Sequence, residues 1–143
     1  MVGHTATART RNTHINLAWT LEDKGRLLLR LYQRALRCME EAIELIEVGE
    51  MVEKGKQLIQ AQDIVLQLAD ALDADGVGPE GREIVANLER LYLYIYRRLI
   101  RGNNALDIGA IEEARTLMGN LCGAWEQALE VGPESLPTAR ARL

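Results

Sequence analysis

The residue types that carry most enzyme chemistry are few in this sequence and stand apart from one another. Both histidines, His4 and His14, lie in a polar N-terminal stretch without regular apolar spacing. Cys38 and Cys122 have no cysteine neighbour, so neither has the spacing of a zinc site or a redox pair. The only serine, Ser135, has no histidine in an ordered segment that could activate it. We therefore expect no catalytic residues, no metal site and no cofactor.

Three further segments resemble functional sites at first sight. The four glutamates in 40–47 fall on or near the polar side of an amphipathic helix, so a solvated face is the simpler interpretation. The segment Gly76-Val77-Gly78 lacks the lysine and the preceding strand of a phosphate-binding loop. Arg97, Arg98 and Arg101 could bind an anion, but the helix dipole also favours basic residues near a helix C-terminus. None of these segments makes a catalytic constellation.

The composition is that of one soluble domain. Of the 143 residues, 48% are apolar and 27% are charged, with 21 acidic against 17 basic side chains. An acidic body without a basic stripe argues against nucleic acid as the partner. The longest uncharged runs are about half a membrane span, and the N-terminus has no apolar signal segment, so we expect no membrane insertion. Two isolated cysteines fit a reducing, cytoplasmic location.

Apolar residues recur every three or four positions over four long segments, which is the pattern of amphipathic helices. Glycine, proline, asparagine and capping residues separate these segments. The expected helices are 20–48, capped by Thr20 and ended by Gly49; 51–72, followed by a turn up to Pro79; 80–101, ended by Gly102-Asn103-Asn104; and 107–130, capped by Asp107. Four such helices joined by short loops run up and down alternately.

The sequence thus predicts an all-α protein, an antiparallel up-down-up-down four-helix bundle over 20–130. Residues 1–19 and 131–143 are expected to form flexible N- and C-terminal tails, because both are polar or rich in turn-forming residues. A single segment challenges this, since L-Y-L-Y-I-Y at 91–96 alternates like a strand. The helical period of the surrounding residues prevails.

On a helix the three tyrosines of this segment point in different directions. Tyr92 is expected to face the core, Tyr94 to face solvent or a subunit contact, and Tyr96 to lie at the margin of the core. The alternation therefore spreads apolar surface further around the helix than a simple bundle needs.

Three of the expected helices carry a second apolar ridge beside the stripe that should form the core. Such ridges indicate either a wide core or a hydrophobic groove for a partner segment, and we predict at least one groove. The N-terminal tail also carries three alternating apolar residues, which could cover such a groove. The ridges are Leu29, Leu36 and Ile43; Val52, Ile59 and Leu66; and Leu93, Tyr96 and Ile100, and the tail residues are Ile15, Leu17 and Trp19.

Several segments together resemble the flagellin export chaperone family, FliS. They are LLLRLY at 27–32, AQDIVLQL at 61–68, LERLY followed by RRL within 88–99, and EEA at 112–114 with Trp125 closing the last helix. The similarity extends in order over about residues 20–130. No single segment is a strong motif, but their common order makes the resemblance specific.

This resemblance implies a non-enzymatic cytoplasmic helical bundle that binds the disordered C-terminal segment of flagellin in apolar surface grooves. Such binding prevents premature polymerisation and delivers the subunit to the flagellar type III export gate. The resemblance also implies a possible homodimer and an N-terminal segment that occupies part of the groove when no client is bound.

Three alternatives remain open at this stage. The protein could be another type III secretion chaperone or adaptor with a different client, or a structural oligomerisation bundle. A small all-helical enzyme such as a mutase would need charged residues facing each other across the core, and the expected core stripes contain essentially none.

Overall fold

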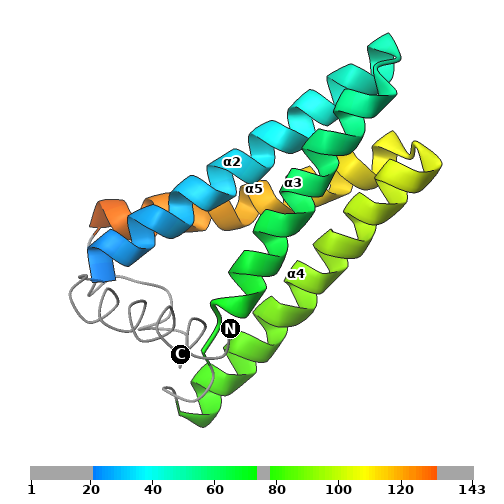
Figure 1. The fold of residues 1–143 in the computed structure, drawn as a ribbon. Helices are drawn as coiled ribbons and strands as arrows, with labels where there is room; N and C mark the ends of the chain where they lie inside the picture. Colours follow the sequence, from blue (N-terminus) through cyan, green and yellow to red (C-terminus); the bar gives the residue numbers. More distant parts are fainter. Residues whose placement is uncertain (1–20, 74–77, 132–143) are drawn as a thin grey trace, which may run out of the picture.

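The computed structural model describes residues 21–73 and 78–131, and these residues form four helices (Figure 1). Each helix packs against two others, because α2 and α4 each contact both α3 and α5. The prediction of an all-α antiparallel four-helix bundle is therefore confirmed. The helices are α2 (Leu21–Val48), α3 (Met51–Asp70), α4 (Pro79–Ala105) and α5 (Ile108–Val131).

Some of the features expected from the sequence lie outside the described residues. They are the Thr20 cap, the apolar tail residues Ile15, Leu17 and Trp19, and the C-terminal segment from 132 onward. At the other boundary, Val131 is the last residue of α5 rather than the first of a tail.

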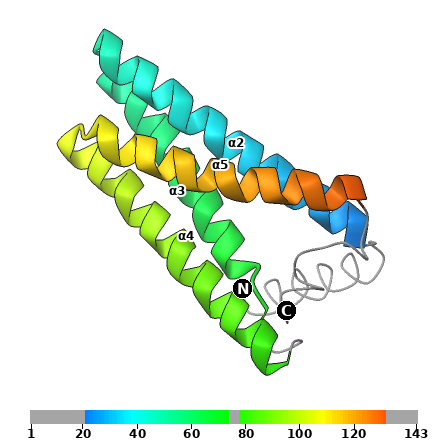
Figure 2. The ribbon, with the colours of Figure 1, turned by 180° about the vertical axis from the view of Figure 1, so that it is seen from behind.

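The four helices do not stay together over their whole length. Both views show two arms that meet where the α2–α3 and α4–α5 connections lie and that separate towards the opposite side (Figures 1 and 2). We call the first side the closed end and the second the open end. At the open end, the start of α2 and the end of α5 share one arm, whereas the end of α3 and the start of α4 share the other.

Local sequence explains the α2–α3 connection. Gly49 has a positive φ of 82°, which glycine adopts without a side-chain clash. The backbone N–H of Glu50 donates to the carbonyl of Leu45 at 2.9 Å, and the N–H of Gly49 donates to that of Ile46 at 3.1 Å. These bonds satisfy carbonyls at the end of α2 and turn the chain directly into α3.

The α4–α5 connection differs from the one the sequence predicts. Gly102 was expected to end the helix, but α4 continues to Ala105 and Leu106 follows it with a left-handed φ of 52°. The expectation was wrong because this glycine serves packing. Gly102 is buried, and a Cβ there would meet the side chain of Ile111 and lie 3.3 Å from the carbonyl oxygen of Asp107. The missing side chain thus lets α4 approach the start of α5 closely.

Asp107 caps α5 as the sequence predicts. Its Oδ1 accepts a hydrogen bond from the backbone N–H of Ala110 at 3.1 Å, and its Oδ2 accepts one from Arg101 Nε at 3.0 Å. Both contacts favour the ionised carboxylate, and the Arg101 bond is the larger cause of the lowered pKa of Asp107. The closed end is therefore held by a cap and an ion pair in addition to apolar contacts.

The core consists of one apolar cluster drawn from all four helices. It includes a bonded aromatic group: Trp125 Nε1 donates to the hydroxyl of Tyr32 at 3.0 Å, and that hydroxyl also bonds to the hydroxyl of Tyr92. Burial raises the pKa of both tyrosines, so both hydroxyls stay protonated and available as donors at physiological pH. This group joins α2, α4 and α5. Its hydrogen bonds give the three polar side chains partners inside an otherwise apolar core, where an unpaired polar group would be costly.

One charged residue of the described chain is buried. Lys54, near the start of α3, is only 7% exposed. Its Nζ donates to the carbonyl oxygen and to the Oδ1 of Asn103, at 3.1 and 2.8 Å, in the last turns of α4. A cation at a helix C-terminus is favoured by the helix dipole, so Lys54 ties the two helices together there.

Candidate functional site

Exposed large apolar side chains mark the candidate site, because a folded monomer normally covers most of them. Two of the predicted ridges contribute to this set. On α3, Val52 is 74% and Ile59 is 52% exposed, while Leu66 is half-buried. On α4, Leu93 is exposed, and Tyr96 and Ile100 are half-buried.

The contact between α3 and α4 fixes how these two ridges sit. Lys54 of α3 reaches Asn103 of α4, and a Cβ on Gly55 would lie 4.0 Å from the same asparagine side chain. Gly55 shares a helix face with Ile59, since the two are four residues apart. The α3 ridge therefore lies beside the seam between α3 and α4.

The α4 ridge borders the same seam. Ile100 and Tyr96 stand three and seven residues before Asn103, which places them on the helix face that meets α3. In antiparallel helices with equal rise, this register puts Ile59 level with 98–99, within one turn of Ile100, and Leu66 level with 91–92, within one turn of Leu93. The two ridges thus lie on either side of the same seam, and we call their residues the α3–α4 surface: Val52, Ile59, Leu66, Leu93, Tyr96 and Ile100.

The α2 ridge lies elsewhere in the fold. A Cβ on Gly25 would lie 2.8 Å from Leu129 of α5, and Gly25 shares its helix face with Leu29 and Leu36. This ridge consequently points towards α5. Leu29 and Leu36 are half-buried, and Ile43 is only 8% exposed and belongs to the core cluster. The structure therefore brings together two of the three ridges.

A second apolar surface was not singled out from the sequence. Ile84, Leu88 and Leu91, in the first half of α4, continue the apolar repeat of Ile95 and Leu99, but all three are half-buried. Leu27 of α2, which is also near the open end, is exposed. The cause is the divergence of the two arms, which leaves these side chains without a full set of neighbours. This partial exposure could not be predicted from helical periodicity, because the apolar period of a helix does not determine the angle at which it packs against its neighbours.

Two of the three arginines near the end of α4, Arg98 and Arg101, have structural partners. Arg98 Nε lies 2.7 Å from Glu113 Oε1 of α5, and the hydroxyl of Tyr94 donates to Glu113 Oε2 at 2.8 Å. The bond to Glu113 is the main reason why the pKa of Tyr94 is raised. Arg101 pairs with Asp107, as described above. The contacts of Tyr94 and Arg98 with Glu113 join α4 to α5. Tyr94 is exposed and Tyr92 is buried, as the sequence predicts.

Neither of the two cysteines is an activated nucleophile. Burial raises the pKa of the Cys38 and Cys122 thiols, which keeps both protonated and weakly nucleophilic. Across 21–73 and 78–131, no three histidine, cysteine or acidic side chains gather in a way that could hold a metal ion. None of the four helices is both long and apolar enough to cross a membrane.

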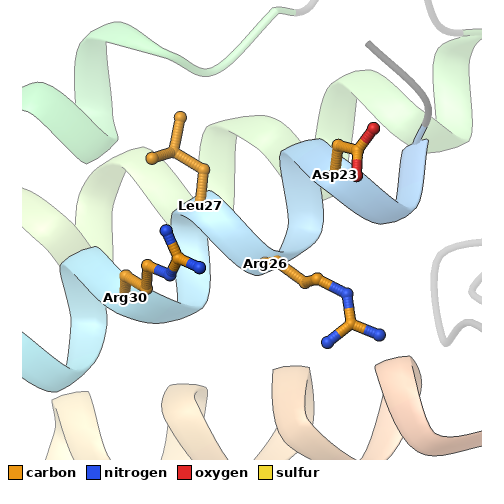
Figure 3. Close-up of a pocket in the computed structure, with 4 residues that line it drawn as sticks. All are labelled: Asp23, Arg26, Leu27 and Arg30. Atoms are coloured by element: carbon orange, nitrogen blue, oxygen red, sulfur yellow. The ribbon is translucent and has the colours of Figure 1, made fainter.

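A small pocket lies on the first turns of α2, with a volume of about 250 Å³. Asp23, Arg26, Leu27 and Arg30 line it, and the Leu27 side chain points away from that of Arg26 (Figure 3). Its lining combines one apolar side chain with charged groups of both signs. This is a shallow surface feature rather than an enzyme cleft.

Comparison with known proteins identifies the family. A family model described as "Flagellar protein FliS" matches residues 6–132 of this chain. The chain belongs to the FliS family. It is 36% identical over 102 residues to the flagellar secretion chaperone FliS of Salmonella typhimurium, covering 71% of this chain and 73% of the relative. It is 32% identical over 106 residues to that of Bacillus subtilis, covering 74% and 75%.

Membership of the FliS family confirms two expectations from the sequence. The resemblance stated above was to this family, and the curated FliS relatives are named as chaperones rather than as enzymes. A FliS chaperone acts through the surface that it offers to another chain.

Proposed function

We propose that this protein is a cytoplasmic export chaperone that binds the disordered C-terminal segment of flagellin and delivers it to the flagellar type III export gate. The observation that carries the proposal is the α3–α4 surface, where two apolar ridges border one seam. Such a surface suits an amphipathic helix whose apolar side chains repeat at three and four residues. Binding would cover apolar side chains of flagellin through which free flagellin subunits polymerise.

The physical balance of such binding favours a reversible complex. A disordered client loses conformational entropy when it becomes helical, which costs several kcal/mol of the gross interaction energy. An extended apolar contact is needed to offset that loss. The remaining affinity is then modest, which permits release at the export gate.

The α2 ridge and the N-terminal tail have different places in this proposal. Leu29 and Leu36 are half-buried towards α5 and add contact area beside α2, whereas Ile43 offers little surface. The tail residues Ile15, Leu17 and Trp19 would cover apolar surface in the absence of the client. A chain lacking residues 1–19 should therefore bind the client more tightly than the full chain does.

The test is a titration with a peptide that corresponds to the C-terminal segment of flagellin from the same organism. Circular dichroism should show a gain of helix on binding. Leu93→Asp and Ile100→Asp should each weaken binding by at least about tenfold, because each buries a charge in the apolar contact. Both variants should keep the helix content of the free protein.

Val48→Asp provides a control, since Val48 is 70% exposed but lies at the end of α2, on neither of the two helices that form the α3–α4 surface. It should bind the peptide like the unmodified chain. Full-strength binding by folded Leu93→Asp and Ile100→Asp would exclude the α3–α4 surface as the client site. Absence of any binding to the unmodified chain would exclude this segment of flagellin as the client.

A further inference from the structure

The α3 side of the α3–α4 surface carries exposed acidic side chains. Asp63 and Asp70 follow the ridge residues Ile59 and Leu66 by four positions each. At 3.6 residues per turn, a residue four positions further along a helix is turned by about 40°. Gly55, four positions before Ile59, is turned the other way and lies beside α4. The two aspartates therefore lie on the side of the ridge that faces away from the seam, and we call them the acidic border.

The α4 side carries exposed basic side chains in the corresponding place. Arg90 and Arg97 stand seven positions apart, so they lie on one side of the helix. Arg97 and Tyr96 are turned to opposite sides of Leu93, and Tyr96 is on the face that meets α3. Glu89 lies on the seam side of Leu93 and is a separate position. Arg90 and Arg97 thus flank the α4 ridge on its outer side, and we call them the basic border.

The fold itself does not pair these charges. Within 21–73 and 78–131, neither aspartate of the acidic border forms an ion pair, and the same holds for Arg97. Arg90 donates to the neutral side-chain oxygen of Asn87. Asp70 is the last residue of α3, where the helix dipole disfavours an anion. Helix stability therefore does not explain the two borders.

Other charges around the surface are neutralised by neighbours. Lys56 lies on the same side of α3 as Asp63, but it is paired with Glu53 at 3.2 Å. Arg98 and Arg101 on α4 are likewise paired with acidic side chains of the fold. What remains is one negative and one positive border, on opposite sides of the two apolar ridges.

We propose that the two borders select a client helix whose apolar stripe has basic residues on one flank and acidic residues on the other, and that they fix its direction. This inference rests on the proposed function, because it takes the α3–α4 surface as the client site. α3 and α4 run side by side in both views, so one helix can lie over their seam (Figures 1 and 2). Its flanks then face the borders, as the flanking positions of a coiled coil face the neighbouring helix.

The opposite signs of the borders determine the direction of the client. A helix that is turned end for end over the same seam exchanges its two flanks, so only one direction sets its basic flank beside Asp63 and Asp70. The spacing of seven within each border corresponds to about two helical turns, so a client with a seven-residue repeat meets each border twice. Two borders of the same sign would leave the two directions equivalent in charge.

The borders contribute specificity rather than most of the affinity. Exposed ion pairs each add little, and salt screens them. The wrong direction, however, loses the attractions and also gains repulsions between like charges. We expect reversal of one border to weaken binding of a matched helix by about five- to tenfold at low salt and by less than about twofold at high salt.

The test uses two synthetic peptides of two heptads each, with leucine at the a and d positions. One has lysine at e and glutamate at g, and the other has these residues exchanged, so the two share one composition. Each carries a nitroxide spin label at its N-terminus. In the NMR spectrum of the full chain, one label should broaden the amide signals around Leu66, towards the open end. The other label should broaden those around Val52, near the closed end.

Substitutions in the borders should reverse or remove this preference. Asp63→Arg/Asp70→Arg/Arg90→Asp/Arg97→Asp exchanges the two borders without changing the net charge. Each peptide should then bind about as tightly as before but in the opposite direction. Arg90→Glu/Arg97→Glu makes both borders acidic, so both peptides should bind more weakly and in both directions.

Arg37→Glu/Arg115→Glu is the matched control. It changes the net charge by the same amount as Arg90→Glu/Arg97→Glu, but on exposed positions of α2 and α5. It should keep the affinity and the direction of both peptides. Circular dichroism on every variant verifies that the helices are retained.

Failure of this inference and failure of the proposed function give different results. If the flagellin peptide does not bind while the designed peptides reverse direction as expected, the borders stand and flagellin is not the client. If the flagellin peptide binds while the designed peptides keep one direction in every folded variant, the borders are overturned and the client stands. Absence of binding by both designed peptides to the unmodified chain would also overturn the borders.

Discussion

The two halves of α4 carry the same apolar repeat but are buried to very different degrees. In the first half, near the open end, Ile84, Leu88 and Leu91 remain half-buried. In the second half, near the closed end, Ile95 and Leu99 are fully buried. The difference lies in the neighbours, because the arms meet only at the closed end (Figures 1 and 2).

This contrast separates a fully packed part of the core from a part that is only partly covered. Apolar side chains at the closed end stabilise the fold, since their burial removes them from water. Those at the open end are only partly covered and contribute less. A substitution of the same chemical kind should therefore have different effects in the two halves.

The largest expected effect comes from shortening the same residue type in each half. Ile95→Ala should lower the free energy of unfolding by about 2–5 kcal/mol, because it leaves a cavity in the core. Ile84→Ala should lower it by about 1 kcal/mol or less, since its side chain is already partly in water. Urea unfolding followed by circular dichroism measures both values. Equal losses would show that the arms are equally packed in solution.

A second, smaller effect tests the close approach of α4 and α5 at the closed end. Gly102→Ala should lower the free energy of unfolding by about 1–2 kcal/mol, because the clash with Ile111 outweighs the gain in helix propensity. Gly123→Ala is the matched control, since Gly123 of α5 has open space at its Cβ position. It should raise stability by about 0.5–1 kcal/mol. Stabilisation by Gly102→Ala would contradict the close approach.

The smallest effect concerns the charge on Asp107 at the α4–α5 connection. Its pKa is lowered in the folded state, so its ionised form stabilises the fold above the pKa of an unfolded aspartate. That contribution is lost as the pH falls through the folded-state pKa. The melting temperature of Asp107→Asn should therefore lie below that of the unmodified chain at neutral pH and approach it in acid. A difference in melting temperature that is independent of pH would show that the charge on Asp107 does not contribute to stability.

Much of the fold could be predicted from the sequence, because helix formation and termination are local. The apolar period gave the four helices, Gly49 ended α2, and Asp107 capped α5. Gly102 was misread as a helix end because its reason is a tertiary contact with Ile111. A glycine required for close packing and one required for a turn look alike in a single sequence.

The candidate site could be predicted only in part. Periodicity identified the extra ridges, including Ile59 on α3 and Ile100 on α4, but it does not say which helices are neighbours. It therefore could not show that these two ridges border one seam while that of Leu36 turns towards α5. The partial exposure of Leu88 likewise depends on the angle between the arms.

Trp125, whose indole N–H donates a hydrogen bond to Tyr32, can serve as an internal fluorescent probe. The chain contains two tryptophans, so Trp19→Phe would leave Trp125 as its single indole fluorophore. The emission of an indole depends on the polarity around its ring, and Trp125 packs beside the core on the arm formed by α2 and α5. A change in emission wavelength on client binding would thus report rearrangement of this arm, even though the α3–α4 surface lies on other helices.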